Sequence, residues 1–397
     1  MKYFLFIYTI FFILNSSADE GVDLLKKLVN ISSGSTNIEG VNEVQKVVSE
    51  ELEKIGFKIE NISYPQNKLG QLIVGTIKGK DPSFITFIIH ADTVFEKSSG
   101  FEGYRISEDG LKAFGPGVID DKGGIVVLLN GLKDFLKDNP EIKYSLRVIS
   151  SPGEEVGTPK FLTAYKAYSK DSRLVLGFEP CLEDGSIIDS RRGNIWYQIK
   201  VVGREAHAGR SHKTGINACW DLAKKLDKVS QLTDYKKDIT VSIGHIEGGK
   251  DKFNVVCGEA SAKIDVRFSK IEDQEQIHKK IMNLLNTSYV SSQSDSKPTE
   301  TFIEIVDNVS PFSASSEAVE KINEIRKSIK KYENLEVHSM QSGGSADSNN
   351  FARPGLPIID GLGACGGKMH TNEEFIILSS LKTRSEVLID LLKKNLK

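Results

Sequence analysis

Hydrophobic residues in the first half of the chain follow two spacings, which together predict a layered α/β fold. Amphipathic helices are predicted at residues 21–31, 38–55 and 124–136. Short buried strands are predicted at residues 71–77, 84–90, 145–151 and 174–178. Thr36 and Glu39 are spaced as a capping box for the second helix. Strands that alternate with helices favour a central, mixed but largely parallel sheet flanked by helices.

The spacing changes near Gly193, where apolar and polar residues begin to alternate as in a sheet with one solvated face. Strands are predicted at residues 195–201, 239–246, 260–268 and 302–306. Helices are predicted at residues 216–232 and 272–285. This β-α-β-β-α-β order is that of a ferredoxin-like α+β sandwich.

Helix and strand patterns like those of the first half return near the end of the chain, at residues 316–332, 357–362 and from about 381. The simplest organisation is one discontinuous α/β domain that is interrupted by a smaller α+β domain. We predict the α/β domain at residues 19–191 and 308–397, and the inserted domain at residues 192–307. A chain of 397 residues is long enough to bury a core in each.

The first residues have the pattern of a secretory signal peptide, which we assign to residues 1–18. Lys2 precedes an apolar run at residues 4–14, and small residues suited to cleavage follow it. The run is short for a membrane span, although a retained anchor is the alternative. We therefore expect a secreted or periplasmic protein.

Composition and charge exclude some classes of partner. The formal net charge is −2, so the balance of acidic and basic residues does not indicate a nucleic acid or an anionic membrane as the main partner. No second apolar stretch approaches spanning length, so no membrane partner is expected once the signal peptide is removed.

The chain has four cysteines, and their spacing favours no pairing. They are Cys181, Cys219, Cys257 and Cys365, and no C-x-x-C pair occurs among them. An oxidising compartment would permit disulfides. We interpret the four as buried or free thiols.

Polar residues follow the predicted strands at points where folding alone does not require them. His90 ends one strand and Asp92 follows two residues later, so the carboxylate can reach the imidazole and orient it. Alone, this pair is more typical of a structural histidine beside a capping aspartate. Asp120 and Asp121 lie in a glycine-bounded turn before a helix, where they can cap the helix or bind cations.

Three further segments add acids and a histidine. Glu154 and Glu155 follow a strand between glycines, as a surface turn or as a base beside a metal ligand. Glu179 ends another strand, and His370 lies in a loop far downstream. Together these segments supply the ligand types that zinc accepts, at strand ends where α/β sheets bind ligands. The combination predicts a zinc site.

On these segments the sequence resembles the zinc-dependent exopeptidase family of glutamate carboxypeptidases, aminoacylases, succinyl-diaminopimelate desuccinylase and acetylornithine deacetylase. The bacterial carboxypeptidase G type is the most similar, and the resemblance covers essentially the whole mature chain. It implies two Zn²⁺ ions, with cobalt or manganese as alternatives. The implied ligands are His90 and His370 on separate ions, Asp120 between them, and Glu155 and Glu179 on one side each. It also implies Glu154 as general base, Asp92 as the orienting acid and a cis Asp120–Asp121 peptide.

The resemblance extends into the inserted domain, which it identifies as a lid and dimerisation domain. The segment at residues 203–209 matches the family's Gly-x-x-x-His-Ala-Gly motif and contains His207. In dimeric relatives this histidine reaches the partner's active site and steadies the developing oxyanion. Asn254 and Arg267 resemble residues that hold a substrate carboxylate. A homodimer through the lid domain is therefore expected.

One departure bears on specificity. Carboxypeptidase G-like enzymes have an arginine before a proline where the chain returns to the catalytic domain, and here Ser310 precedes Pro311. Losing a guanidinium weakens the case for a C-terminal glutamate side chain.

The resemblance implies amide hydrolysis of a small peptide or an N-acyl amino acid. Two zinc ions about 3.5–4 Å apart would share Asp120 and a water, and Glu154 would take the proton. A carboxypeptidase of the glutamate carboxypeptidase type is the first interpretation, and an N-acyl amino acid deacylase is the alternative. From another class, a non-catalytic secreted binding protein would have no need of Glu154.

Overall fold

The structure is a computed structural model that describes residues 20–63, 69–157, 161–182 and 184–396. The predicted signal peptide at residues 1–18 lies outside the described residues. The chain divides into two compact units. The first contains the chain through Ser190, Ser313–Ser342 and everything from Ala346 onward, and the second contains Arg191–Phe312 and Gly343–Ser345. The inserted domain predicted at residues 192–307 falls within the second unit.

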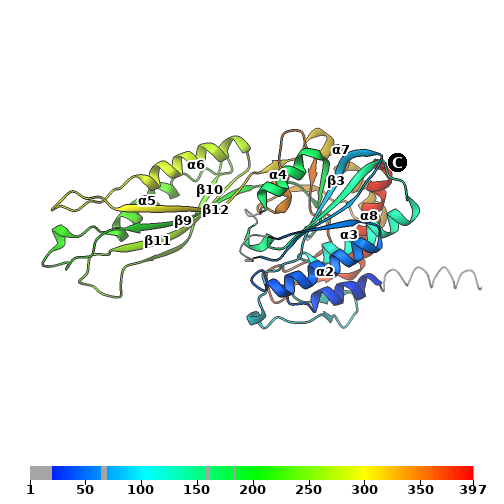
Figure 1. The fold of residues 1–397 in the computed structure, drawn as a ribbon, viewed down its shortest axis with the longest axis horizontal. Helices are drawn as coiled ribbons and strands as arrows, with labels where there is room; N and C mark the ends of the chain where they lie inside the picture. Colours follow the sequence, from blue (N-terminus) through cyan, green and yellow to red (C-terminus); the bar gives the residue numbers. More distant parts are fainter. Residues whose placement is uncertain (1–19, 64–68, 158–160, 183, 397) are drawn as a thin grey trace, which may run out of the picture. The chain divides into compact units, whose positions relative to one another are not determined.

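The first unit is built on a six-stranded mixed sheet of order β1-β2-β6-β3-β7-β15 (Figure 1). The strands are β1 (Lys58–Ile62), β2 (Leu72–Ile77), β3 (Asp81–His90), β6 (Tyr144–Ser151), β7 (Ser172–Gly177) and β15 (Ile358–Ile359). The last four in the sheet order are mutually parallel, whereas β1 and β2 are antiparallel to their neighbours. The predicted α/β fold with a largely parallel sheet is confirmed.

Helices flank this sheet and supply most of its core. They span residues 20–29, α2 (Ile38–Lys54), α3 (Lys122–Asp138), α4 (Leu162–Asp171), α7 (Ser316–Glu333) and α8 (Leu378–Asn395). Helix α3 packs against α8, and its apolar residues from Ile125 to Leu129 are all buried. Burying such side chains stabilises the fold by about 1.5–3 kcal/mol each.

The predicted capping box of α2 is wrong by one residue. Asn37 is the N-cap, and its Oδ1 accepts a hydrogen bond from the backbone N–H of Gly40 at 3.4 Å. The backbone N–H of Thr36 instead donates to Glu96 at 2.9 Å. That contact bridges residues far apart in the sequence, so local spacing could not reveal it.

Small sheets and 3₁₀ turns complete the first unit. A four-stranded sheet has the order β16-β17-β5-β4, and a three-stranded sheet has the order β13-β8-β14. Their strands are β4 (Arg105–Ile106), β5 (Lys112–Phe114), β8 (Ile187–Arg191), β13 (Phe312–Ser313), β14 (Ser339–Ser342), β16 (Gly366–Gly367) and β17 (Phe375–Ile377). The 3₁₀ helices described in this unit are η1 (Lys97–Ser99), η2 (Glu154–Val156) and η4 (Asp347–Phe351), whereas η3 (His212–Thr214) belongs to the second unit.

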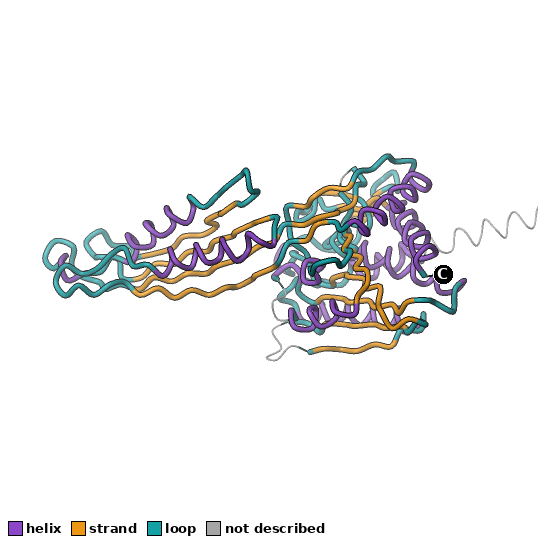
Figure 2. Tube along the Cα trace, turned by 90° about the horizontal axis from the view of Figure 1, so that it is seen from above, coloured by secondary structure: helices purple, strands orange, loops and turns teal. Residues whose placement is uncertain are grey.

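The second unit is an antiparallel sheet of order β10-β11-β9-β12 with two helices (Figure 2). Its elements are β9 (Gly193–Val202), α5 (Ala218–Ser230), β10 (Thr240–Gly248), β11 (Glu259–Phe268), α6 (Ile271–Asn286) and β12 (Glu300–Val309). The alternating apolar side chains of β9, from Ile195 to Val201, are buried in its core. The predicted ferredoxin-like topology is confirmed.

The interpretation of the four cysteines as free thiols is wrong. Cys181 is bonded to Cys365 and Cys219 to Cys257, with Cα–Cα distances of 5.1 and 5.7 Å. The first pair is separated by 184 residues and the second by 38. Which cysteines meet depends on the tertiary fold, so the spacing gave no signal.

Replacing both Cys181 and Cys365 by serine is expected to lower the free energy of unfolding by about 2–4 kcal/mol, because the bridge closes a long loop. Denaturant unfolding of the oxidised protein measures the loss. A Cys219→Ser, Cys257→Ser variant is the matched control, and its shorter loop predicts a smaller loss. Peptide mapping without reductant that finds free thiols at these positions would contradict the pairing.

In the described part of the chain, no helix combines the length and the apolar character needed to cross a bilayer.

Candidate metal centre

Three neighbouring parallel strands bring the predicted ligands to one edge of the sheet. His90 is the last residue of β3 and pairs in register with Ser151, the last residue of β6. Glu154 follows three residues after Ser151, in the turn that η2 forms. On the other side of β3, strand β7 ends at Gly177, and Glu179 follows it. The carboxyl ends of parallel strands meet at one edge, so these side chains converge.

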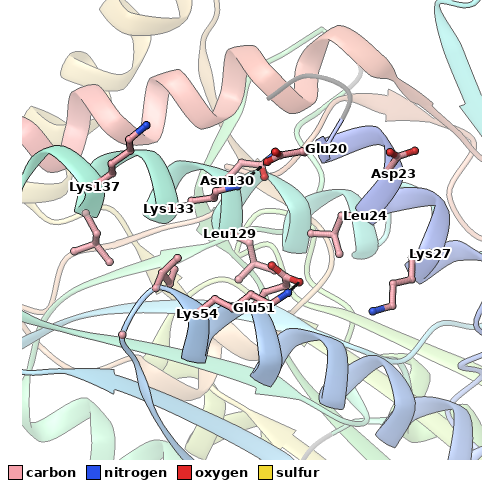
Figure 3. Close-up of a pocket in the computed structure, with 13 residues that line it drawn as sticks. Glu20, Asp23, Leu24, Lys27, Glu51, Lys54, Leu129, Asn130, Lys133 and Lys137 are labelled. Carbon is pink, nitrogen blue, oxygen red and sulfur yellow. Dashed lines mark hydrogen bonds and ion pairs between the residues drawn. The ribbon is translucent and has the colours of Figure 1, made fainter. Parts of the chain in front are cut away.

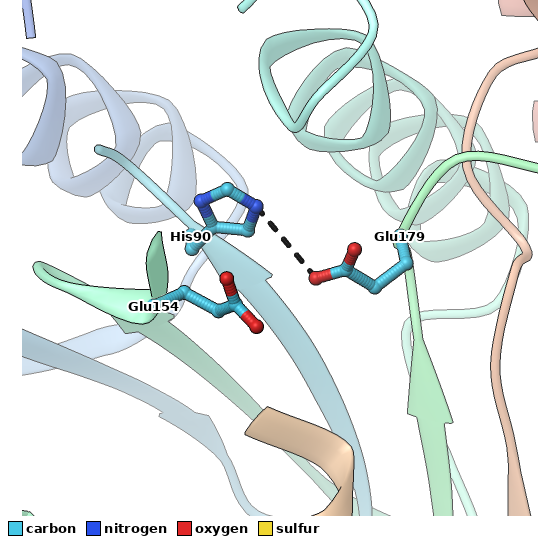
Figure 4. A group of neighbouring side chains, drawn as sticks. All are labelled: His90, Glu154 and Glu179. Atoms are coloured by element: carbon cyan, nitrogen blue, oxygen red, sulfur yellow. Dashed lines mark ion pairs between the residues drawn. The ribbon is translucent and has the colours of Figure 1, made fainter. Parts of the chain in front are cut away.

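His90 lies at the centre of this cluster and is buried. Its Nε2 lies 3.0 Å from Oδ1 of Asp120 and 3.6 Å from Oε1 of Glu179. Figure 4 shows the side chains of His90, Glu154 and Glu179 pointing toward one another. The Nδ1 of His90 lies 3.1 Å from the backbone oxygen of Asp92 and 3.4 Å from its carboxylate. Asp92 can therefore orient the ring, leaving Nε2 for a ligand.

Asp120 faces a second histidine with its other oxygen. Its Oδ2 lies 3.2 Å from Nε2 of His370, which is also 3.5 Å from Oε2 of Glu155. The two oxygens of one carboxylate therefore point at two different imidazoles. Asp120 therefore connects the two histidines of the cluster.

Among the described residues, two groups of ligand atoms are close enough to hold a cation. One contains His90, Glu154 and Glu179, and the other contains His90, Asp120 and Glu155, with all ligand atoms in each group within 4.8 Å of one another. Oxygen and imidazole nitrogen are zinc ligands. The first group shows that Glu154 lies within ligand reach, so geometry alone allows it to be a ligand or a base.

Asp92 also fixes the turn that carries both glutamates. Its fully buried carboxylate accepts hydrogen bonds from the backbone N–H groups of Glu154 at 3.0 Å and Glu155 at 3.2 Å. The Ser35 hydroxyl donates to it at 2.6 Å. One acid thus positions both the candidate ligand His90 and the paired glutamates.

The electrostatics of the cluster favour a cation. Burial, followed by the charge of Glu179, raises the pKa of Glu154 well above its usual range. Burial, followed by the charge of Asp120, raises the pKa of Glu155 to about 8. Among the described residues, Oε1 of Glu155 and Oδ1 of Asp121 are buried without a hydrogen-bond partner. Crowded carboxylates with unpartnered oxygens fit bound metal ions, which supply the missing positive charge.

The pKa values of the two histidines are also raised, but here the neighbouring carboxylates are the cause. Burial alone would lower the pKa of His90, but hydrogen bonds to Asp120 and Asp92 hold it well above its usual value. The hydrogen bond with Asp120 raises the pKa of His370 to about 9. Burial would raise the pKa of Asp120, yet His370 and His90 hold it below its usual value. The two histidines therefore favour the ionised form of Asp120.

The loop that carries Asp120 and Asp121 is held by its neighbours. The Asp120–Asp121 peptide is cis, as the resemblance implied. Oδ2 of Asp121 accepts a hydrogen bond from the backbone N–H of His90 at 3.1 Å. A Cβ at Gly124 would lie 2.0 Å from Oδ1 of Asp121 and 2.1 Å from the backbone oxygen of Phe178. Only glycine fits there, so helix α3 can approach the strand end closely.

Gly124→Ala is expected to lower the free energy of unfolding by about 1–3 kcal/mol, because the new methyl group overlaps a backbone oxygen that cannot move away freely. Thermal or urea unfolding measures the loss. Gly244→Ala is the matched control, since a Cβ there meets no atom within 4 Å. Equal stability of the two variants would show that the close approach is not required.

The structure also reveals site residues that the sequence analysis did not single out. Glu374 is fully buried, and its Oε1 accepts hydrogen bonds from the backbone N–H groups of Ile119 and Asp120. Lys122 is buried and donates to the backbone oxygens of Ile31 and Pro116. The signal available in the sequence was that both Glu374 and Lys122 are charged residues close to a predicted ligand. Their importance follows from their burial, which the sequence of a turn does not reveal.

Asp347 is a further acid near the base candidate. It is buried, and the Tyr165 hydroxyl donates to its Oδ2 at 3.2 Å. The charge of Asp347 contributes to the raised pKa of Glu154, after burial and Glu179. Asp347 follows Gly343 and Gly344 closely in the sequence and was not among the predicted site residues.

The predicted substrate-binding residues all belong to the second unit. His207 is exposed, and its Nδ1 accepts hydrogen bonds from the backbone N–H groups of Gly209 and Arg210, both at 3.2 Å. Asn254 is exposed, and Nε of Arg267 lies 2.9 Å from Asp265. None of the three is in the carboxylate cluster of the first unit, and their roles stay predictions.

A cavity of about 930 Å³ in the first unit does not coincide with this cluster. It lies among the helix at residues 20–29, α2 and α3, and charged side chains line it (Figure 3). Lys133 pairs with Glu20 and Lys54 with Glu51, each at 2.6 Å. It contains none of the predicted ligands and no histidine, so we interpret it as a solvated groove between helices.

Comparison with known proteins supports the predicted resemblance. Residues 189–293 match the peptidase dimerisation domain M20_dimer. Carboxypeptidase G2 of Pseudomonas sp. (strain RS-16) is 27% identical over 371 residues, which cover 91% of this chain and 86% of the relative. Succinyl-diaminopimelate desuccinylase of Rickettsia rickettsii (strain Sheila Smith) is 22% identical over 92% of this chain and 97% of the relative.

Solved structures share the fold over nearly the whole chain. The M20 family metallo-carboxypeptidase Sso-CP2 from Sulfolobus solfataricus matches with a TM-score of 0.74 at 17% identity, over 94% of this chain and 98% of its own. Aminopeptidase PepT from Bacillus cereus ATCC 10987 matches with a TM-score of 0.72 at 20% identity, over 95% of this chain and 98% of its own. The chain thus contains a region that matches the peptidase dimerisation domain, is similar over most of its length to carboxypeptidase G2 and to succinyl-diaminopimelate desuccinylases, and shares the fold of an M20 family metallo-carboxypeptidase.

Proposed function

We propose that the protein is a di-zinc hydrolase that cleaves an amide bond in a small peptide or an N-acyl amino acid. The observation that carries the proposal is Asp120, whose two oxygens lie 3.0 Å from His90 and 3.2 Å from His370. Zinc suits this mixed set of imidazole and carboxylate ligands. Cobalt and manganese accept similar ligands and are the alternatives.

Each side chain has a defined task in this proposal. Asp120 bridges the two positions, and the remaining ligands are His90 with Glu179 on one side and His370 with Glu155 on the other. Bound zinc supplies Lewis acidity toward the scissile carbonyl and activates water at neutral pH. Glu154 takes the proton of the attacking water and passes it to the leaving amine.

Two substrate classes remain, and a different observation favours each. Carboxypeptidase activity of the glutamate carboxypeptidase type is the first candidate, because carboxypeptidase G2 is similar over most of both chains. The second is N-acyl amino acid deacylation, favoured by similarity to succinyl-diaminopimelate desuccinylases. Ser310, which donates to Gln274 at 2.9 Å, stands where the carboxypeptidase G type has arginine, and this weakens a glutamate-specific assignment.

The second unit acts in this proposal as a lid and as the contact of a homodimer. The matched peptidase dimerisation domain supports that role. His207 would steady the developing oxyanion in the partner's site, and Asn254 and Arg267 would hold the substrate carboxylate. Analytical ultracentrifugation of the purified protein tests the dimer, and a monomer at micromolar concentration would contradict it.

We further propose a secreted or periplasmic location. Support comes from the signal-peptide pattern at residues 1–18 and from two disulfides, which persist in oxidising compartments. Fractionation of cells followed by N-terminal sequencing tests the location. Recovery of the protein in the cytoplasm with residues 1–18 attached would contradict it.

The test of function is hydrolysis by the purified, zinc-loaded protein. The panel contains C-terminal dipeptides, folyl-glutamate analogues, N-acetyl amino acids and an N-succinyl amino acid. Turnover of the first two groups would assign a peptidase, and turnover of the last two a deacylase. Two bound zinc ions with no turnover of any substrate would overturn the proposal in favour of a binding protein.

A further inference from the structure

Glu374 is a buried carboxylate at the metal centre that the proposed mechanism does not use. It is 0% exposed, and its Oε1 lies 3.0 Å from the backbone nitrogen of Ile119 and 3.4 Å from that of Asp120. Within the described part of the chain, its Oε2 has no hydrogen-bond partner. The only hydrogen bonds that it accepts there are from this backbone pair.

These hydrogen bonds reach the residue that links the two halves of the centre. Asp120 is the carboxylate between His90 and His370, and its backbone direction decides where both of its oxygens point. A second interaction joins the same two segments, because β17 pairs with β5 and places Phe375 opposite Phe114. Glu374 extends this connection from the strand pair to the bridging ligand itself.

Glu374 is also fixed on the side of His370. Its backbone N–H donates to the oxygen of Thr371 at 3.0 Å, and that of Thr371 donates to the oxygen of Lys368 at 3.1 Å. His370 lies inside this turn with a φ of 62°. One turn therefore presents His370 outward to Asp120 and sends Glu374 inward to the backbone of Asp120.

We propose that Glu374 is a positioning residue that locks the His370 turn to the Asp120 loop and so sets the spacing of the two metal positions. The role rests on the two backbone hydrogen bonds and on the proposed di-zinc function. Removing hydrogen bonds that orient metal ligands costs about 10–100-fold in metal affinity.

An alternative role for Glu374 is that of a buried counter-charge. Lys122 is buried nearby, and its charge lowers the pKa of Glu374, which burial raises to about 8. The ammonium of Lys122, however, donates to the oxygens of Ile31 and Pro116. A Glu374→Gln variant separates the two roles, because glutamine keeps the accepting oxygen and loses the charge. A positioning role predicts that zinc affinity is kept, whereas a counter-charge role predicts that it falls.

The experiment measures zinc affinity of full-length variants by competition with a chelating dye, and records the absorption spectrum of the cobalt-substituted protein. Glu374→Ala is expected to weaken zinc binding by about 10–100-fold and to change the cobalt spectrum. Glu374→Gln is expected to bind zinc as the wild type does. If Glu374→Ala does not fold, Glu374→Asp also withdraws the accepting oxygen, and the same loss is expected.

The matched control is Asp221→Ala in the second unit. Asp221 is likewise 0% exposed and accepts a backbone N–H, that of Tyr289, at 2.6 Å. This variant is expected to lose thermal stability and to keep its zinc affinity. Circular dichroism confirms that each variant is folded before zinc is measured.

The possible results separate the proposals. Weaker binding in Glu374→Ala with normal binding in Glu374→Gln supports the inference. Unchanged affinity in Glu374→Ala, or an equal loss in Glu374→Gln, overturns it and leaves the di-zinc function intact. A wild-type protein that binds fewer than two zinc ions overturns the proposed function, and the inference falls with it.

Discussion

Glu154→Gln is expected to lower kcat by about 10²–10⁴-fold and to leave two zinc ions bound, because the variant lacks only the group that moves the proton. Glutamine has the shape of glutamate but cannot accept a proton at neutral pH. Steady-state kinetics on the best substrate of the panel, together with metal analysis of the same sample, measure both quantities.

The zinc measurement separates the two uses that geometry allows for Glu154. If this side chain were a ligand, as its closeness to His90 and Glu179 permits, the variant would lose metal together with activity. Full activity with both ions bound would remove Glu154 as the base. Glu141→Gln is the matched control, because Glu141 has a 77% exposed side chain paired with Lys80, and its activity should not change.

Removal of metal is expected to abolish hydrolysis and to lower the thermal unfolding temperature. An ion that binds only the folded chain stabilises it by about 2.7 kcal/mol at a hundredfold excess over its Kd. Without the ions, the buried carboxyl groups of Glu154 and Glu155 lie close to other carboxylates with no positive metal charge between them. Calorimetry before and after treatment with a chelator, and again after zinc is restored, measures the effect.

Asp120→Ala provides the control for this experiment. The variant lacks the carboxylate between the two histidines, so added zinc should raise its unfolding temperature by less than that of the wild type. Equal stabilisation of both proteins would place the zinc elsewhere. Undiminished hydrolysis by the metal-free protein would contradict the metal requirement.

The elements that carry a strong periodic pattern could be predicted from the sequence. The alternation from Ile195 to Val201 predicted strand β9, and the apolar run before His90 predicted β3. Both patterns follow from burial on one or two faces of a strand, which acts residue by residue. The same logic placed His90, Glu155 and Glu179 at strand ends, and the structure brings them together.

Features that depend on contacts between distant segments could not be predicted. The disulfides join positions 184 and 38 residues apart, and no local rule selects those partners. Glu374 lies among the acids of an ordinary loop sequence, and only the fold shows that it is buried against Ile119. Lys122 likewise gains its role from the oxygen of Ile31, a distant part of the chain.

The Cys181–Cys365 bond has a consequence for proteolytic damage. The core of the second unit, Arg191–Phe312, lies between these two cysteines in the sequence. A protease that cuts one exposed loop of this unit therefore leaves both pieces of the chain in a single covalent molecule. His90 lies on one piece and His370 on the other, so a nicked molecule still carries every proposed zinc ligand. Two fragments would separate only after reduction, which gel electrophoresis with and without reductant would display.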